Sequence, residues 1–73
     1  MAMTLRAARV NAGLTQQEAA EKIGVTANTV SRWELGISSP TFKYMHPICE
    51  AYGLNGYEDI IFLPRNNAES VNS

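Results

Sequence analysis

The segment 46–50, HPICE, holds three side chains of the types that ligate metal ions: an imidazole, a thiol and a carboxylate. His46 and Cys49 are three residues apart, a spacing that can bring two ligands to one face of a helix. However, Pro47 lies between them, and no further strong ligand is evident in the sequence. A lone cysteine in such a helix is usually a small core residue. We therefore expect Cys49 to be core, and we expect no metal site and no cofactor.

The segment 26–32, TANTVSR, carries polar side chains that suit the recognition of nucleic-acid bases. Asn28 can form a bidentate contact with adenine, and Arg32 can do the same with guanine. Ala27 offers only a methyl group, which suits the methyl group of thymine. An arginine on a surface helix is often an ordinary solvated charge. The interpretation of this segment therefore depends on the helices that carry it.

Capping signals predict two short helices on either side of Gly24. Thr15 and Glu18 form a capping box, which begins a helix over residues 16–23. Gly24 ends this helix, and Thr26 caps the next, over residues 27–35. Two helices joined by so short a glycine turn are typical of a helix-turn-helix.

Three further helices complete the predicted fold. The first spans residues 4–11, with Gly13 in the left-handed cap position. Thr41 caps a fourth helix over residues 42–52, which Pro47 should kink or delay. A short fifth helix covers residues 57–62. Because no segment alternates like a strand, we predict an all-α, five-helix bundle over residues 1–63, followed by a flexible tail over residues 64–73.

The helix-turn-helix pattern rests on a small set of restricted positions. Ala20 is small enough to lie where the two helices cross, and Gly24 allows the turn. The apolar side chains beneath the crossing are expected to be Ile23, Val25, Val30 and Trp33. We interpret Trp33 as core rather than as a platform for a stacked base.

The stretch LRAARVNAGLTQQEAAEKIGVTANTVSRWELGISSP resembles, nearly end to end, the DNA-binding domain of lambdoid phage repressors and Cro proteins, the wider XRE family. The resemblance covers residues 4–63. It implies a two-fold dimer that binds a double-stranded DNA operator, with the third helix in the major groove. It also implies a cytoplasmic transcription regulator, repressor-like or Cro-like, encoded by a bacterium or a phage.

The resemblance implies which side chains contact the bases of DNA and which contact its phosphates. The positions expected to face base edges are Thr26, Ala27, Asn28, Thr29 and Arg32. Gln16, at the start of the second helix, is expected to hold a phosphate where free backbone N–H groups favour an anion. The other expected phosphate contacts are Gln17, Arg6, Ser31, Ser38, Ser39, Thr41 and Lys43.

The same resemblance predicts an ion pair, and an apolar run near the C-terminus predicts an interface. In the family, an arginine of the first helix pairs with a glutamate at the end of the third, and Arg9 and Glu34 match these positions. The apolar run over residues 60–63 is more than one short helix can bury, so Phe62 and Leu63 are the candidates for a homodimer interface.

Length and composition limit the classes of protein to which this chain can belong. The 73 residues allow one domain, and the 45% of hydrophobic residues suffice for a single core. A single cysteine excludes an internal disulfide, and neither a signal peptide nor a membrane span is evident. No convergent nucleophile and base is present, so an enzyme is not expected, and the length leaves no room for a small-molecule domain.

The charge balance keeps a second function open. Six Lys and Arg against seven Asp and Glu give a net charge of −1, whereas nucleic-acid binders are usually basic. The same fold could instead serve as a protein-interaction module, like an antitoxin or antirepressor. The polar outer face of the third helix argues against this alternative, because interface cores are richer in aromatic residues.

Overall fold

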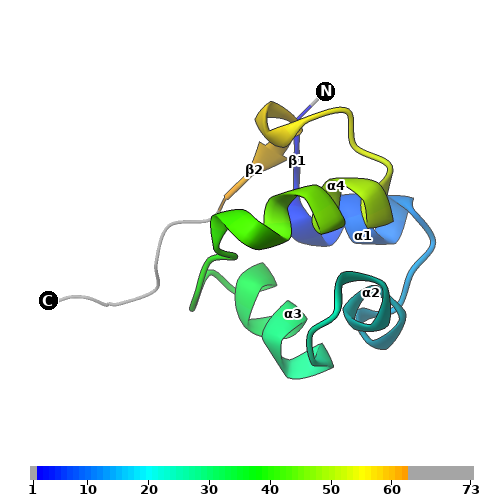
Figure 1. Cartoon of the computed structure of the whole chain (residues 1–73), viewed down its shortest axis with the longest axis vertical. Coiled ribbons are helices and arrows are strands. Elements are labelled where there is room, and N and C mark those ends of the chain that lie inside the picture. The colour runs from blue at the N-terminus through cyan, green and yellow to red at the C-terminus, as the bar shows by residue number, and fades with distance from the viewer. Residues whose placement is uncertain (1, 63–73) are drawn as a thin grey trace, which may run out of the picture.

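The computed structural model describes residues 2–62, which fold into a mostly helical domain. Its α-helices are α1 (Leu5–Asn11), α2 (Gln16–Ile23), α3 (Ala27–Glu34) and α4 (Met45–Tyr52). In Figure 1, α1 and α4 run across the middle of the molecule, with two short strands above them and with α2 and α3 below. The predicted tail over residues 64–73 lies outside the described residues.

Threonine side chains cap the first three helices; the sequence predicts this for Thr15 and Thr26, whereas Thr4 was expected inside the first helix. Thr4, Thr15 and Thr26 each accept a hydrogen bond from a backbone N–H three residues on, at 3.0–3.1 Å. The Glu18 carboxylate accepts from the Thr15 N–H at 2.9 Å, which completes the capping box. These bonds satisfy backbone donors that have no partner inside a helix. The start of α2 and that of α3 are therefore confirmed.

Glycines end α2 and α4 in the left-handed conformation. Gly24 has φ 95° and Gly53 has φ 70°, values that a residue with a Cβ adopts only at a cost. The Gly24 N–H donates to the Ala20 carbonyl at 2.8 Å, so the turn also satisfies the end of α2. The helix ends predicted at these two glycines are confirmed.

The start of α4 differs from the prediction of one helix over residues 42–52. A 3-10 turn covers Phe42–Tyr44, and the α-helix begins only at Met45. Pro47 is the third residue of α4, where a backbone N–H would lack a partner within the helix anyway. Pro47 therefore delays the regular helix rather than kinking it. The predicted Thr41 cap is wrong, because its side chain makes no capping hydrogen bond.

The predicted fifth helix is wrong, and with it the all-α assignment. Residues Tyr57–Asp59 form a 3-10 turn, and β2 (Ile60–Ile61) follows directly. β2 pairs in parallel with β1 (Met3–Thr4), Met3 opposite Ile60. Two β-branched residues in succession favour an extended backbone, and a single helical turn gains too few hydrogen bonds to offset its nucleation cost. The four strand residues thus join the two ends of the described chain.

The core lies between α1, α4 and the inner faces of α2 and α3. Val30 and Ile48 are completely buried, and Trp33 is 7% exposed, which confirms its predicted core position. Cys49 is also buried, as expected of a core cysteine. Tyr52 is buried among these residues, and the desolvation of its phenol raises its pKa to about 12, with the Glu34 charge adding to the effect.

Two adjacent isoleucines test whether β2 is built as described. Ile60 is 8% exposed and Ile61 is 48% exposed, because neighbouring strand residues point to opposite faces. We expect Ile60→Ala to lower the free energy of unfolding by about 2–4 kcal/mol, and Ile61→Ala by about 1 kcal/mol or less. Urea unfolding followed by Trp33 fluorescence measures both. Equal losses would contradict the strand.

Candidate nucleic-acid interface

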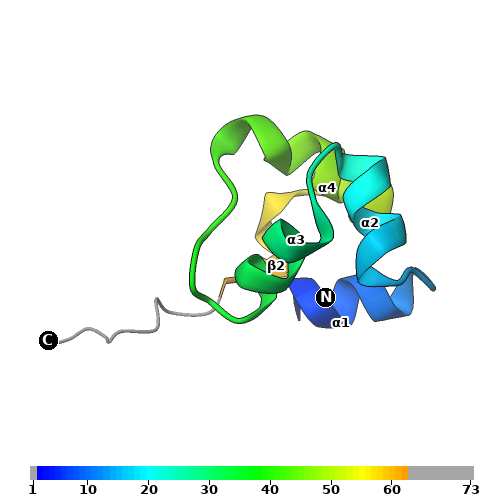
Figure 2. The same ribbon diagram turned by 90° about the horizontal axis from the view of Figure 1, so that it is seen from below.

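The turn between α2 and α3 sets the two helices against each other. Ala20, 3% exposed, lies on the buried side of α2, where only a small side chain allows a close approach. The Gly24 and Val25 N–H groups both donate to the Ala20 carbonyl, at 2.8 and 3.0 Å. Seen from below in Figure 2, α3 lies between α2 and the segment that leads to α4. This arrangement leaves the outer face of α3 uncovered.

Asn28 and Arg32 are the free polar side chains of that outer face. They are four residues apart on α3, which places them one helical turn from each other on the same side. Both residues are exposed, and neither side chain has a hydrogen bond or an ion pair within residues 2–62. Their full hydrogen-bonding capacity is available to a ligand: the carboxamide of Asn28 donates and accepts, and the guanidinium of Arg32 donates through five N–H bonds.

Thr26 and Thr29 are less free than the sequence suggests. The Thr26 hydroxyl oxygen accepts the Thr29 N–H at 3.1 Å, and the two hydroxyl oxygens lie 2.9 Å apart in a shared hydrogen bond. The capping bond therefore occupies much of the hydrogen-bonding capacity of both hydroxyl groups. Ala27 and Ser31 are half-buried on the flanks of α3.

A buried ion pair joins α1 to α3. The Arg9 Nε donates to Glu34 Oε2 at 2.6 Å, and the Arg9 Nη2 donates to Glu34 Oε1 at 3.2 Å. Arg9 and Glu34 are each only 9% exposed. The third guanidinium nitrogen donates to the Leu14 carbonyl at 2.8 Å, which fixes the loop before α2. The hydrogen bond to Glu34 raises the pKa of Arg9 further above its ordinary value, and desolvation opposes it in part.

Gln16 makes a contact that sequence reasoning missed. Its Nε2 donates to Glu34 Oε1 at 3.1 Å, so the first residue of α2 is tied to the last residue of α3. The two residues are 18 positions apart, and no local pattern links them. Only the family position of Gln16 and the predicted Arg9–Glu34 pair, taken together, could have pointed to it.

The polar residues of the loop after α3 differ in how far they are exposed and bonded. The Ser38 N–H donates to the Arg32 carbonyl at 3.4 Å, so the backbone of Ser38 is hydrogen-bonded to the last turn of α3. Ser39 and Thr41 are exposed. The Lys43 ammonium lies 5.0 Å from the centre of the Tyr44 ring, and that ring packs on Trp33 at 5.6 Å. The Lys43 side chain is exposed, and this cation–π contact places it over a ring that packs against the core.

Arg6 and Gln17 complete the set of expected phosphate contacts. Both side chains are exposed, Arg6 on α1 and Gln17 in the first turn of α2. Neither has a hydrogen bond or an ion pair in the described part of the chain.

Comparison with known proteins agrees with this geometry. Residues 5–58, which contain α1 to α4, match the family model described as helix-turn-helix. The chain belongs to the Cro/XRE-like helix-turn-helix family. It is also 39% identical over 69 residues to an archaeal protein of Methanothermobacter thermautotrophicus (strain Delta H) that carries the name "Uncharacterized HTH-type transcriptional regulator". The match covers 94% of this chain and 100% of that protein. No solved structure matches the chain.

The family assignment agrees with the expectation that the chain is not an enzyme. The expected bacterial or phage source gains no support from the relative, which is archaeal. Among the described residues of this helix-turn-helix protein, no helix has both the length and the apolar character needed to cross a membrane.

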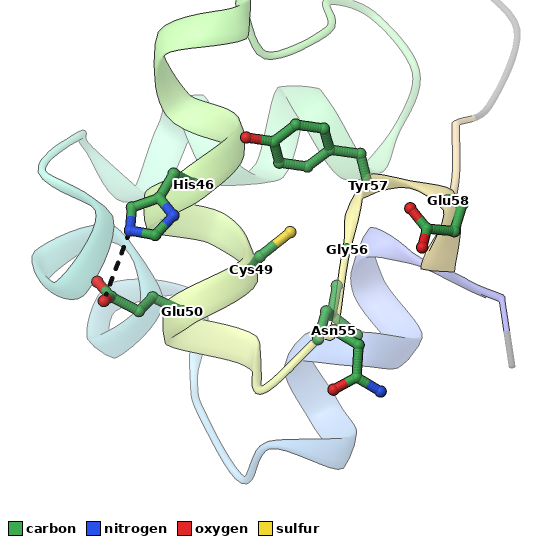
Figure 3. Close-up of a pocket in the computed structure, with 8 residues that line it drawn as sticks. His46, Cys49, Glu50, Asn55, Gly56, Tyr57 and Glu58 are labelled. Atoms are coloured by element: carbon green, nitrogen blue, oxygen red, sulfur yellow. Dashed lines mark ion pairs between the residues drawn. The ribbon is translucent and has the colours of Figure 1, made fainter.

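A pocket of about 430 Å³ lies between α4 and the loop that leads to β2. Figure 3 shows His46 and Glu50 on one side of α4, whereas the Cys49 sulfur points toward the loop. His46 Nε2 and Glu50 Oε2 are 3.6 Å apart on exposed side chains. Burial raises the pKa of the Cys49 thiol, and the charges of Asp59 and Glu58 add to this effect. Within residues 2–62, no three side chains of ligating type converge on a metal position.

Exposed apolar side chains lie near the end of the described chain. Phe62 is 40% exposed, and Leu63, the other expected interface residue, lies outside the described residues. A second pair of exposed apolar side chains was not expected from the sequence. Phe42 is 78% exposed, and its ring lies edge to face with the Tyr57 ring, with 5.9 Å between the ring centres.

The buried ion pair between Arg9 and Glu34 should contribute to the free energy of unfolding of this helix-turn-helix protein. Arg9→Met leaves the buried Glu34 carboxylate without its counter-charge, so we expect a loss of about 3–5 kcal/mol in the free energy of unfolding. Arg6→Met, on the exposed side of the same helix, should cost less than about 0.5 kcal/mol. The double variant Arg9→Met/Glu34→Met should recover much of the loss, because it removes both buried charges. Urea unfolding measures the free energy of unfolding of all three variants. If Arg9→Met is as stable as the control Arg6→Met, the ion pair does not have the stabilising role described.

Proposed function

We propose that this chain is a sequence-specific transcription regulator that binds double-stranded DNA with α3 in the major groove. The observation that carries the proposal is the pair Asn28 and Arg32, exposed one turn apart on α3 and free of partners within the described residues. The family match and the name of the archaeal relative support the same function. An α-helix fits the width of the major groove.

Base reading is divided among the side chains of α3 and its cap. Arg32 contacts guanine O6 and N7, and Asn28 contacts adenine N6 and N7, each discriminating by about 1–3 kcal/mol. Ala27 packs on a thymine methyl group. Because Thr26 and Thr29 bond to each other, they contribute less base selectivity than Asn28 and Arg32.

Phosphate contacts fix the register of the protein on the duplex. Gln16 is the principal contact, at the N-terminal end of α2 where the helix dipole favours an anion. The remaining contacts come from Gln17, Arg6, Ser31, Ser38, Ser39, Thr41 and Lys43. With a net charge of −1 and few cations among these residues, affinity is modest and falls only gradually with salt.

The chain acts as a homodimer on an operator with two half-sites about 34 Å apart. Phe62, which is 40% exposed, and Leu63 form the interface. The role we propose is that of a repressor or a Cro-like protein, in which occupation of such a site in the cytoplasm blocks transcription.

A protein-interaction module is the second candidate function. The net charge of −1 and the exposed Phe42–Tyr57 pair favour it, because aromatic side chains are enriched at protein interfaces. In that case α3 would bind no duplex.

Two substitutions separate base reading from phosphate binding. A preferred duplex is first selected from a randomised pool, and affinities are then measured on it and on an unrelated duplex. Arg32→Ala should lose about 1–3 kcal/mol on the preferred duplex and most of the selectivity, whereas Gln16→Ala should weaken binding to both duplexes alike.

Lys22→Ala is the control for charge, since it removes an exposed cation from α2 that has no assigned contact. It should change affinity far less than Arg32→Ala. If both test variants lose affinity equally on every sequence, the assigned roles are wrong. If no duplex is selected from the pool, the DNA-binding function itself is wrong.

A further inference from the structure

The Glu34 carboxylate collects three donors from two other elements. Arg9 supplies two of them, at 2.6 and 3.2 Å, and Gln16 supplies the third, at 3.1 Å. The two bonds from Arg9 already form a bidentate pair between α1 and α3. The bond from Gln16 is therefore not needed to fasten those two helices, and its consequence lies at the start of α2.

The contact with Glu34 decides which way the Gln16 carboxamide faces. An ionised carboxylate only accepts hydrogen bonds, whereas a carboxamide has an accepting oxygen and a nitrogen with two N–H donors. If the Gln16 amide were rotated by half a turn, its oxygen would face Glu34 Oε1. Both atoms are acceptors, so they would repel each other instead of forming a hydrogen bond. Glu34 thus holds the amide nitrogen in one orientation. One N–H is used by Glu34, and the second remains for another acceptor.

The charge of Glu34 would by itself repel an anion near Gln16. Arg9 removes this obstacle, because its guanidinium lies directly against the same carboxylate. The combined Arg9–Glu34 unit has no net charge, yet it still orients the amide. Gln16 itself is half-buried, which limits the other rotamers open to it.

We propose that Glu34, neutralised by Arg9, is a positioning residue that presents the second N–H of the Gln16 carboxamide to a DNA phosphate. This inference rests on the proposed DNA-binding function and assigns Glu34 a part in it. Since the amide is oriented before DNA arrives, less rotamer entropy is lost when the phosphate binds. DNA affinity therefore depends on a side chain at the far end of α3 that need not touch the DNA.

A double-mutant cycle on DNA affinity tests the coupling. Glu34→Gln keeps the shape of the side chain but removes its charge and replaces one acceptor oxygen by a donor nitrogen. With a mixed-sequence duplex at low salt, we expect Gln16→Ala and Glu34→Gln each to weaken binding about tenfold. Glu34→Gln should add little to that loss in the Gln16→Ala background, because Glu34 acts through Gln16.

Glu21→Gln is the matched control, since it makes the same change of charge at an exposed position of α2. It should not weaken binding. Circular dichroism establishes that each variant is folded at the temperature of the measurement. If Glu34→Gln weakens binding equally with and without Gln16, its role is only structural and the proposal is overturned. If the unsubstituted protein binds no duplex, the proposed function has failed instead.

An NMR measurement on the unsubstituted protein covers the case in which Glu34→Gln does not fold. In the free protein, one Gln16 side-chain amide proton should be shifted downfield by its bond to Glu34. Addition of the duplex should shift the other proton. Shifts on the backbone amides of α3 with both Gln16 protons unmoved would overturn the proposal and leave DNA binding intact.

Discussion

The buried pair of Arg9 and Glu34 is the interaction on which the arrangement of the helices depends. A charged pair this deep is weak evidence for net stability, since desolvation can cancel the attraction between the charges. Its value here is geometric. Arg9 bonds to Glu34 and to the Leu14 carbonyl, so α1, the loop before α2 and the end of α3 are held in one relation. Together with the α2–α3 turn and the packing of Val30 and Trp33, these bonds hold α3 in place and so direct the outer face of that helix.

The small size of the domain explains why directional contacts matter so much. A chain of 73 residues buries a limited fraction of its surface, so apolar packing alone leaves a thin margin. Val30 and Trp33 use the inner face of α3 for this core, and the opposite face is left polar and exposed. The inner face of α3 therefore serves stability, and its outer face serves recognition in the function we propose; the helical periodicity of 3.6 residues per turn separates the two faces.

Local signals in the sequence predicted the central helices well. The Thr15–Glu18 capping box and the left-handed Gly24 are decided within a few residues, so α2 has the predicted bounds and α3 the predicted start. The exposed polar face of α3 and the Arg9–Glu34 positions could also be taken from the sequence, the latter through a family resemblance.

What the sequence did not reveal depends on distant partners. A fifth helix was expected over residues 57–62, yet Ile60 pairs with Met3, a partner 57 positions away that no local pattern indicates. The Gln16–Glu34 bond likewise joins two elements separated by the turn, and a hydrogen bond at such a distance leaves no periodic trace. Pro47 was ambiguous for a different reason, because its effect depends on where the helix begins.

Binding of double-stranded DNA by the outer face of α3 and the start of α2 can be followed residue by residue. The most direct measurement is a map of backbone amide shifts in labelled protein as a mixed-sequence duplex is added, at low and at moderate salt. We expect the shifts to gather on residues 16–17, 26–32 and 38–43 and to weaken as salt rises, because phosphate contacts depend on salt. An absence of shifts in these segments even at low salt would contradict this expectation and would favour a protein partner for this fold.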